Sequence, residues 1–373
     1  MSNFCQVKLG DVLTFQRGFD ITKNEQLEGN VPIVSSSGIT SYHNKWKQQK
    51  PGVVIGRKGT LGTVHYISIN YWPHDTTLWV KDFKGNDPRF LCYFLQTLHL
   101  ENFDTGASNP TLNRNHLHKI KVRFPKAPIQ RKIAAILSAY DDLIENNQRR
   151  IALLERMAEE IYREWFVRMR FPGHEQVKFE KGVPEGWEIK RLGEVIELCY
   201  GKALKEDERV PGEFPVYGSS GVVGTHNKPL VAGPGIVVGR KGNVGSVHWT
   251  DRDFYPIDTA YYVKSNISGY YLFFLLHSMN FINNDAAVPG LNRNQAYSNK
   301  FFLPEKRLIL EFSRVTEYLF TMKQKLTKKN EMLRATRDML LSRLISGTLS
   351  VENLDIQFPP RMLNDAATEA RAE

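Results

Sequence analysis

The sequence has few cysteines and no long apolar run. Three of its 373 residues are cysteine, Cys5, Cys92 and Cys199. Their odd number and wide spacing argue against a disulfide framework and against a zinc site. No stretch approaches the roughly 18 to 20 consecutive apolar residues that cross a bilayer. The N-terminal MSNFCQVKLGDV lacks the basic start and apolar run of a secretory signal. We therefore expect a protein of the reducing cytoplasm without membrane contact.

Catalytic signatures are also missing. The chain has no GxxxxGK[ST] nucleotide loop, no carboxylate cluster with a lysine, and no Asn/Asp-Pro-Pro-aromatic motif of DNA methyltransferases. Its one Pro-Pro pair, Pro359-Pro360, follows Phe358. Residues 56–62 have the pattern GxxGxxG but lack the βαβ context of a dinucleotide site. We expect no catalytic residue, cofactor, metal ion or small-molecule substrate.

The chain is basic, and its positive charge is uneven. Lysine and arginine number 50 against 40 acidic residues, which gives a net charge of +10. Residues 1–128 hold 16 basic and 9 acidic residues, a balance of +7, whereas residues 173–304 hold 14 of each. This charge fits a polyanionic partner. We expect general electrostatic attraction to be stronger in the first part of the chain.

Two copies of one long segment make up most of the chain. A shift of 183 residues aligns residues 9–80 with 192–263, and a shift of 179 aligns 112–125 with 291–304. This period is far too long for a solenoid and indicates duplicated domains. We call residues 9–125 the first copy and 192–304 the second copy. The shared motifs are Gly56-Arg57-Lys58-Gly59 and Gly239-Arg240-Lys241-Gly242, Ser36-Ser37-Gly38 and Ser219-Ser220-Gly221, Asp75-Thr76 and Asp258-Thr259, and Leu112-Asn113-Arg114-Asn115 and Leu291-Asn292-Arg293-Asn294.

Each copy is predicted to be mostly strand. Short runs rich in Val, Ile and Tyr alternate with Gly, Pro, Asn and Ser, as at residues 52–56 and 62–67, which is typical of strands joined by tight turns. One helix is predicted in each copy, at Pro88–Gln96 and at Tyr270–Met279. The fold class is therefore α+β.

Two long helices are predicted after the copies. Residues 130–170 contain no Gly or Pro, and their apolar residues follow a heptad, which predicts about 40 residues or about 60 Å of helix. A second such helix is predicted from Lys306 to Ser346. We expect the two to pair as an antiparallel coiled coil, with one copy at each end. In the first helix, one apolar seam holds Leu137, Ile144, Ile151, Ala158 and Trp165. The other holds Ile133, Tyr140, Leu154 and Ile161, and Asn147 interrupts it, as polar residues that fix register do.

This order of domain, helix, domain and helix resembles the specificity subunit of type I restriction-modification systems. The local motifs are also similar: Ile129-Gln130-Arg131-Lys132-Ile133-Ala134-Ala135-Ile136-Leu137-Ser138 opens the first helix, and Phe171-Pro172-Gly173-His174 follows it. Leu340-Leu341-Ser342-Arg343-Leu344-Ile345-Ser346-Gly347 closes the second. On this basis we expect target-recognition domains at 1–128 and 173–305, spacer helices at 129–172 and 306–350, and a polar, poorly ordered tail at 351–373.

The resemblance implies a subunit without chemistry of its own. Two methyltransferase subunits and a translocating restriction subunit would join it to make the full enzyme. Each recognition domain would bind one half of an asymmetric double-stranded DNA site, and the helices would set the distance between the halves. The complex would methylate adenine or cut the DNA.

Gly-Arg-Lys-Gly, between two predicted strands, is the strongest candidate for DNA contact. Glycine permits close backbone approach, and the two cations can reach phosphates or a guanine edge. Residues that the copies share should position the DNA backbone, and residues that differ should contact bases. The shared Arg57, Lys58, Arg240 and Lys241 are therefore predicted phosphate contacts. The predicted base contacts are the side chains at four equivalent positions where the copies differ. In the first and the second copy respectively, these are Thr60 and Asn243, Arg17 and Tyr200, Phe19 and Lys202, and Tyr42 and Thr225.

Simpler explanations stand beside several of these predictions. A basic hairpin turn is often only solvated, and the Ser-Ser-Gly motifs fit a tight turn better than a phosphate contact. The Leu-Asn-Arg-Asn motifs fit a turn as well as a DNA contact, and the duplicated His65 and His248 fit structural strand positions. A further alternative is that the two half-sites have some bases in common, and that the arginine of the Gly-Arg-Lys-Gly motif contacts guanine in each. For the whole chain, the alternative is a free-standing two-headed DNA-binding scaffold or repressor.

Overall fold

The computed structural model describes residues 4–104, 110–279, 281, 290–359 and 362. The chain divides into two compact units. Unit 1 contains residues 1–146 and 329–373, and unit 2 contains residues 147–328. Each unit therefore holds one copy together with part of both long helices. Among the residues described, no helix is long and apolar enough to cross a membrane.

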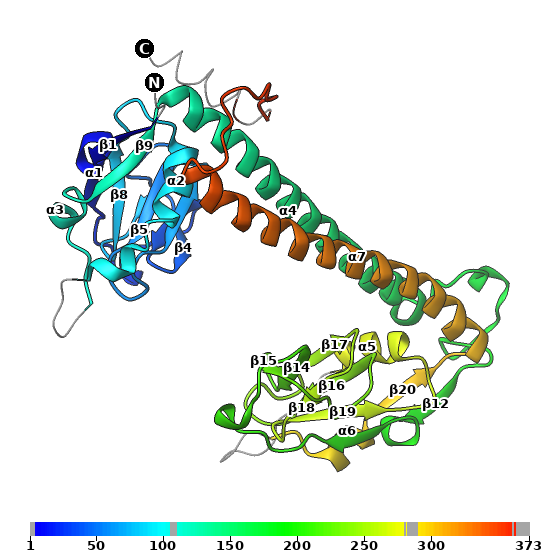
Figure 1. The fold of residues 1–373 in the computed structure, drawn as a ribbon. Helices are drawn as coiled ribbons and strands as arrows, with labels where there is room; N and C mark the ends of the chain where they lie inside the picture. The colour runs from blue at the N-terminus through cyan, green and yellow to red at the C-terminus, as the bar shows by residue number, and fades with distance from the viewer. Residues whose placement is uncertain (1–3, 105–109, 280, 282–289, 360–361, 363–373) are drawn as a thin grey trace. The chain divides into compact units, whose positions relative to one another are not determined.

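The first copy, in unit 1, is built on three small sheets (Figure 1). The four-stranded antiparallel sheet has the order β2-β8-β5-β6, and the three-stranded sheet has the order β4-β3-β7 with β3 and β7 parallel. The third sheet pairs β1, which directly precedes the copy, with β9 at the end of the copy. The strands are β1 (Phe4–Lys8), β2 (Thr14–Arg17), β3 (Val31–Ser35), β4 (Gly38–His43), β5 (Gly52–Gly56), β6 (Val64–Ile67), β7 (Trp72–Pro73), β8 (Thr77–Asp82) and β9 (Lys121–Pro125).

The predicted helix of the first copy is confirmed as α2 (Pro88–Gln96). It begins there because the Asp87 carboxylate accepts a hydrogen bond from the Phe90 N–H at 2.8 Å and Pro88 suits the first turn. The six residues from Phe90 to Leu95 are buried, and they pack in one core with residues of β2, β5 and β8. The remaining helices are α1 (Leu9–Val12) and α3 (Arg114–Leu117), with 3-10 turns at Lys23–Glu25 and Leu100–Phe103.

The second copy, in unit 2, repeats this topology strand for strand. The orders are β13-β19-β16-β17, β15-β14-β18 and β12-β20, and the hairpin of β10 and β11 precedes them. The strands are β10 (Phe179–Glu180), β11 (Val183–Pro184), β12 (Glu188–Arg191), β13 (Glu197–Tyr200), β14 (Phe214–Gly218), β15 (Gly221–His226), β16 (Gly235–Gly239), β17 (Val247–Thr250), β18 (Tyr255–Pro256), β19 (Ala260–Lys264) and β20 (Lys300–Leu303). The helices are α5 (Gly269–Ser278) and α6 (Arg293–Ser298), with 3-10 turns at His174–Gln176, Leu192–Glu194 and Glu206–Glu208.

The two long helices are α4 (Ala127–Tyr162) and α7 (Lys306–Ile345), and they pack together in antiparallel fashion (Figure 1). In unit 1, Asp141 pairs with Arg337, and three residues later the Ile144 carbonyl accepts from Asn330 Nδ2 at 3.3 Å. In unit 2, Glu155 pairs with Lys323 at 2.7 Å. The α+β class with two paired helices is therefore confirmed.

The first helix differs from its predicted bounds at both ends. It starts at Ala127, three residues before Gln130, because Pro128 is compatible with a first helical turn. Its α-helical part ends at Tyr162, and a π-helical turn at Arg163–Val167 follows. There the rings of Trp165 and Phe166 pack on Phe312 of α7.

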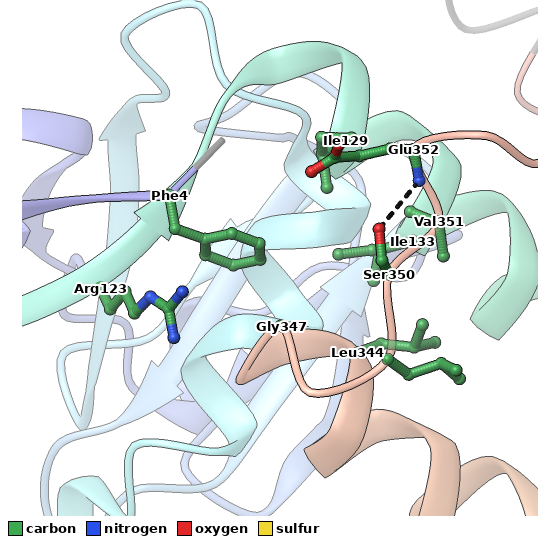
Figure 2. Close-up of a pocket in the computed structure, with 10 residues that line it drawn as sticks. Phe4, Arg123, Ile129, Ile133, Leu344, Gly347, Ser350, Val351 and Glu352 are labelled. Atoms are coloured by element: carbon green, nitrogen blue, oxygen red, sulfur yellow. Dashed lines mark hydrogen bonds between the residues drawn. The ribbon is translucent and has the colours of Figure 1, made fainter. Parts of the chain in front are cut away.

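The start of the polar tail is packed, which the sequence did not predict. Val351 is buried, and Lys132 of α4 donates to the carbonyls of Glu352 and Leu354 at 2.7 and 2.8 Å. Figure 2 shows this segment beside Ile129 and Ile133, with Phe4 facing it. Gly347, at φ 75°, lies where a Cβ would meet the Phe4 ring at 2.9 Å. The expectation of a poorly ordered tail is therefore wrong for residues 351–359, and its remainder lies largely outside the described residues.

Lys132→Met should release this segment. The substitution keeps the length of the side chain but removes the ammonium that the tail carbonyls share, so residues 348–358 should lose protection from amide exchange and from proteases. Lys126→Met, at the exposed residue before α4, is the matched control. Hydrogen exchange by mass spectrometry measures the difference, and equal protection in both variants would show that apolar packing alone holds the tail.

Candidate nucleic-acid interface

The Gly-Arg-Lys-Gly turn of the first copy joins β5 to β6 and contacts two other duplicated motifs. The backbone N–H groups of Arg57 and Lys58 both donate to the Thr76 carbonyl, at 2.8 and 3.0 Å. The Leu112 N–H donates to the Arg57 carbonyl at 3.1 Å. The Asp-Thr and Leu-Asn-Arg-Asn segments, far apart in the sequence, therefore meet at this turn.

The Ser-Ser-Gly motif is the fourth segment of the cluster. Ser36 and Ser37 form the turn between β3 and β4, and the Thr63 hydroxyl donates to the Ser36 carbonyl. The His65 Nε2 lies 3.3 Å from the same oxygen. The strand β6 that leaves the Gly-Arg-Lys-Gly turn is thereby bound to the Ser-Ser-Gly turn. His65 thus has the structural role that the sequence favoured.

The second copy repeats these contacts. The backbone N–H groups of Arg240 and Lys241 donate to the Thr259 carbonyl at 2.9 and 3.1 Å. The Leu291 N–H donates to the Arg240 carbonyl at 2.8 Å. The His248 Nε2 lies 3.2 Å from the Ser219 carbonyl. One set of duplicated motifs therefore builds one four-segment surface twice. We call this surface the motif cluster.

The glycines of the motif are explained by crowding inside the turn. A Cβ on Gly56 would lie 2.0 Å from the Thr60 carbonyl oxygen, and one on Gly239 would lie 2.1 Å from that of Asn243. Gly59 and Gly242 have φ of 77° and 78°, a region that favours glycine. The motif therefore needs its glycines to form the turn, whatever binds to it.

The two cations of the motif have different surroundings. The Arg57 guanidinium is half-buried and donates to the Asp75 carbonyl at 3.3 Å, and Arg240 Nε donates to the Asp258 carbonyl at 3.0 Å. Burial lowers the pKa of Arg57, and the charge of the nearby Arg17 lowers it further. Lys58 and Lys241 are exposed and have no ion-pair partner among the described residues. The arginines therefore brace the loop, and the lysines present positive charge to solvent.

The Leu-Asn-Arg-Asn motifs also contain both residues with a structural role and residues that are exposed. Leu112 and Leu291 are buried, and Asn113 and Asn292 cap the helices α3 and α6, accepting the N–H two residues later at 2.9 Å in each case. Helix capping therefore accounts for both asparagines. Arg114 and Arg293 begin the helices and keep exposed surface, so they remain candidates for DNA contact.

The positions that differ between the copies lie beside the motif cluster at Arg17 and Tyr200. Arg17 Nη2 contacts Asp75 Oδ2 at 2.9 Å. The guanidinium groups of Arg240 and Arg293 lie over the Tyr200 ring, 5.2 and 5.4 Å from its centre. Thr60 and Asn243 are exposed on the turns themselves, Tyr42 and Thr225 are exposed on β4 and β15, and Lys202 is exposed after β13.

An open groove in the first copy contains residues that sequence reasoning missed. Arg17, Phe19 and Asp75 line it together with Lys47 and Trp72. The Lys47 ammonium lies 4.9 Å from the Trp72 ring centre and 5.6 Å from that of Phe19. Lys47 lies in a run of lysines and glutamines without a motif, and its tertiary neighbours alone make it a candidate.

One group of three potential metal ligands occurs among the residues that the structure describes. Asp20, His74 and Asp75 place one ligand atom each within 4.8 Å of one another. Arg17 already pairs with one oxygen of Asp75, and His74 Nδ1 lies 3.2 Å from the other. We assign no metal site to this group.

Comparison with known proteins identifies the family. The family model described as the type I restriction modification DNA specificity domain matches residues 1–156 and 184–312. The MjaIX specificity subunit of Methanocaldococcus jannaschii is 24% identical over 341 residues, covering 80% of this chain and 79% of that protein. The MjaVIII specificity subunit of the same organism is 25% identical over 228 residues, covering 54% and 51%.

A solved structure supports the fold. The type I restriction-modification S subunit from M. genitalium aligns with a TM-score of 0.60 at 18% identity, covering 91% of this chain and 96% of that one. The family match extends over both copies and over parts of both long helices. The chain therefore belongs to the type I restriction-modification DNA specificity family, and it is the non-catalytic DNA specificity subunit of such a system.

Proposed function

We propose that each copy binds one half of a bipartite, asymmetric double-stranded DNA site through its motif cluster. The single observation that carries this proposal is the repetition of one four-segment surface with the same exposed lysine and with different neighbours. Common residues suit the DNA backbone, which is the same in both halves, and differing residues suit bases. The helices α4 and α7 set the number of base pairs between the halves.

The proposed contacts follow the chemistry of each side chain. Lys58 and Lys241 neutralise phosphates, and Arg57 and Arg240 hold their loops in place and add positive charge. The domain bounds predicted from the sequence (1–128, 129–172, 173–305, 306–350 and 351–373) are part of the proposal. The remaining proposed DNA contacts are Arg17, Ser36, Ser37, Tyr42, Gly56, Gly59, Thr60, Asn113 and Arg114 in the first copy, and Lys202, Ser219, Ser220, Gly239, Gly242, Asn243, Asn292 and Arg293 in the second.

The chain acts with partners that carry the chemistry. Two methyltransferase subunits modify adenine at the site, and a restriction subunit that translocates DNA completes the enzyme in the cytoplasm. Family membership supports this set of partners. Purification with a candidate methyltransferase tests it: a stoichiometric complex supports the subunit, whereas a chain that binds DNA alone and ignores the methyltransferase favours a free-standing scaffold or repressor.

Lys58→Ala and Lys241→Ala should each weaken binding to every DNA sequence. Each lysine that neutralises a phosphate releases a counterion, so its loss should reduce the slope of log affinity against log salt by about 0.9. Preference among bases should stay the same. Titration of full-length chain with duplex DNA at several salt concentrations gives the slope.

Lys81→Ala is the matched control for this experiment. Lys81 is exposed near the far end of β8 from the motif cluster, roughly 13 Å along the strand from Thr77. Its loss should leave the salt slope unchanged. A changed preference for particular bases with the slope intact would contradict the phosphate role of Lys58 and Lys241.

A further inference from the structure

Asp75 and Asp258 occupy equivalent positions in the two motif clusters. The backbone carbonyl of each accepts a hydrogen bond from the motif arginine of its copy, Arg57 at 3.3 Å and Arg240 at 3.0 Å. The same short segment therefore holds a carboxylate beside the proposed DNA surface in both copies. The side chains that surround this carboxylate differ between the copies.

In the first copy the carboxylate is engaged. Arg17 Nη2 lies 2.9 Å from Asp75 Oδ2, and His74 Nδ1 lies 3.2 Å from Oδ1. The Asp75 side chain is 20% exposed, whereas that of Arg17 is 54% exposed. One part of the guanidinium is thus held by the carboxylate, and the remainder of this planar fork of donors faces outward.

In the second copy neither of these neighbours is present. Tyr200 stands at the position of Arg17, and Ile257 stands at that of His74. Asp258 is exposed, and its carboxylate makes no ion pair or hydrogen bond with the described residues. The neighbouring guanidinium groups of Arg240 and Arg293 lie instead over the Tyr200 ring.

The side-chain groups that can contact DNA therefore differ between the copies at this one equivalent position. An arginine fork with outward donors matches the O6 and N7 acceptors of guanine in the major groove. An unpaired carboxylate accepts hydrogen bonds, and both cytosine N4 and adenine N6 offer amino donors in the major groove. Cytosine is the better match, because adenine places its N7 acceptor beside the amino group, where it repels a carboxylate. Next to phosphates a carboxylate without a donor is repelled, so it also disfavours bases that offer no amino group.

We propose that Arg17, positioned by Asp75, is a specificity-determining residue for guanine in the first half-site, and that Asp258 is one for cytosine in the second. This inference rests on the proposed function and names the bases that its motif clusters distinguish. Tyr200 is the residue that separates the two cases, because it replaces the arginine that would pair with the Asp258 carboxylate, and Arg240 and Arg293 lie over its ring.

The test uses the full-length chain and a random library of duplex DNA, with base preference read at each position after selection. Asp258→Asn should lower the preference for cytosine at one base pair of the second half-site at least tenfold and leave the first half-site unchanged. Asp75→Asn should lower the preference for guanine in the first half-site alone, since Arg17 loses its charged partner. Tyr200→Arg should create a guanine preference in the second half-site.

Glu197→Gln is the matched control, because Glu197 is exposed at the far end of the strand that carries Tyr200. Both asparagine variants are isosteric with the native residue, and melting curves verify that they fold. The inference would be overturned if Asp258→Asn and Tyr200→Arg left the base preference in the second half-site unchanged, or if they lowered the affinity for all sequences equally. A wild-type chain that selects no bipartite sequence at all would instead overturn the proposed function.

Discussion

Gly239→Ala is expected to lower DNA binding by the second copy at least tenfold. The added Cβ would lie 2.1 Å from the Asn243 carbonyl oxygen and 2.4 Å from the Ser246 hydroxyl. These atoms cannot simply withdraw, because the Gly245 N–H donates to the Gly239 carbonyl at 2.8 Å and the Gly239 N–H donates to the Ser246 carbonyl at 2.7 Å. The turn must therefore open, at a cost of about 1–3 kcal/mol or more.

Opening the turn displaces the two cations that follow it. Arg240 and Lys241 share the Thr259 carbonyl, and that arrangement depends on the path of the chain through Gly239. The loss should therefore affect the second half-site alone, since the motif cluster of the first copy is unaltered. Binding to duplexes that contain either half-site, measured separately, gives the two affinities.

Gly269→Ala is the control in the same copy. Gly269 is the first residue of α5, and a Cβ there would meet only the Trp249 ring, at an ordinary 3.4 Å. This variant should keep full binding and gain slightly in stability, as alanine is a better helix former. If both variants bind the second half-site as the wild type does, the turn at Gly239 does not position a DNA contact.

Phe312→Ala is expected to destabilise unit 2 by about 3–5 kcal/mol. Phe312 of α7 is fully buried, and its ring packs on those of Trp165, Phe166 and Phe274 at centroid distances of 6.0, 5.1 and 6.0 Å. These rings come from the π-helical turn after α4 and from α5 of the second copy. Removal of the ring leaves a cavity where the helices meet the copy, so α5 should lose much of its support.

Hydrogen exchange resolved along the chain measures this effect unit by unit. Amides of α5 and β17 should exchange faster in Phe312→Ala, and amides of α2 in unit 1 should keep their wild-type rates. Tyr318→Ala is the control on the same helix, because Tyr318 is 67% exposed and its loss should change stability by less than about 0.5 kcal/mol. Equal destabilisation of both units in Phe312→Ala would mean that they unfold as one.

Several helices of this chain are encoded by local sequence patterns. The helices predicted at Pro88–Gln96 and Tyr270–Met279 both occur, as α2 and α5. The heptad predicted α7 to within one residue, Lys306–Ile345. The tail was misjudged because Val351 and Leu354 are held by Lys132, some 220 residues earlier, and no local pattern reports such a contact.

By itself, the sequence determined that the chain is two copies of one unit, each followed by a long amphipathic helix. These are properties of repetition and periodicity, and both can be read along the chain. The tertiary structure alone decided that the four duplicated motifs form one surface. It also decided that Asp75 pairs with Arg17 whereas Asp258 stands without a partner among the described residues. Hydrogen bonds between strands bring together residues that lie tens of positions apart, so the neighbours of a charged side chain depend on the fold rather than on its place in the sequence.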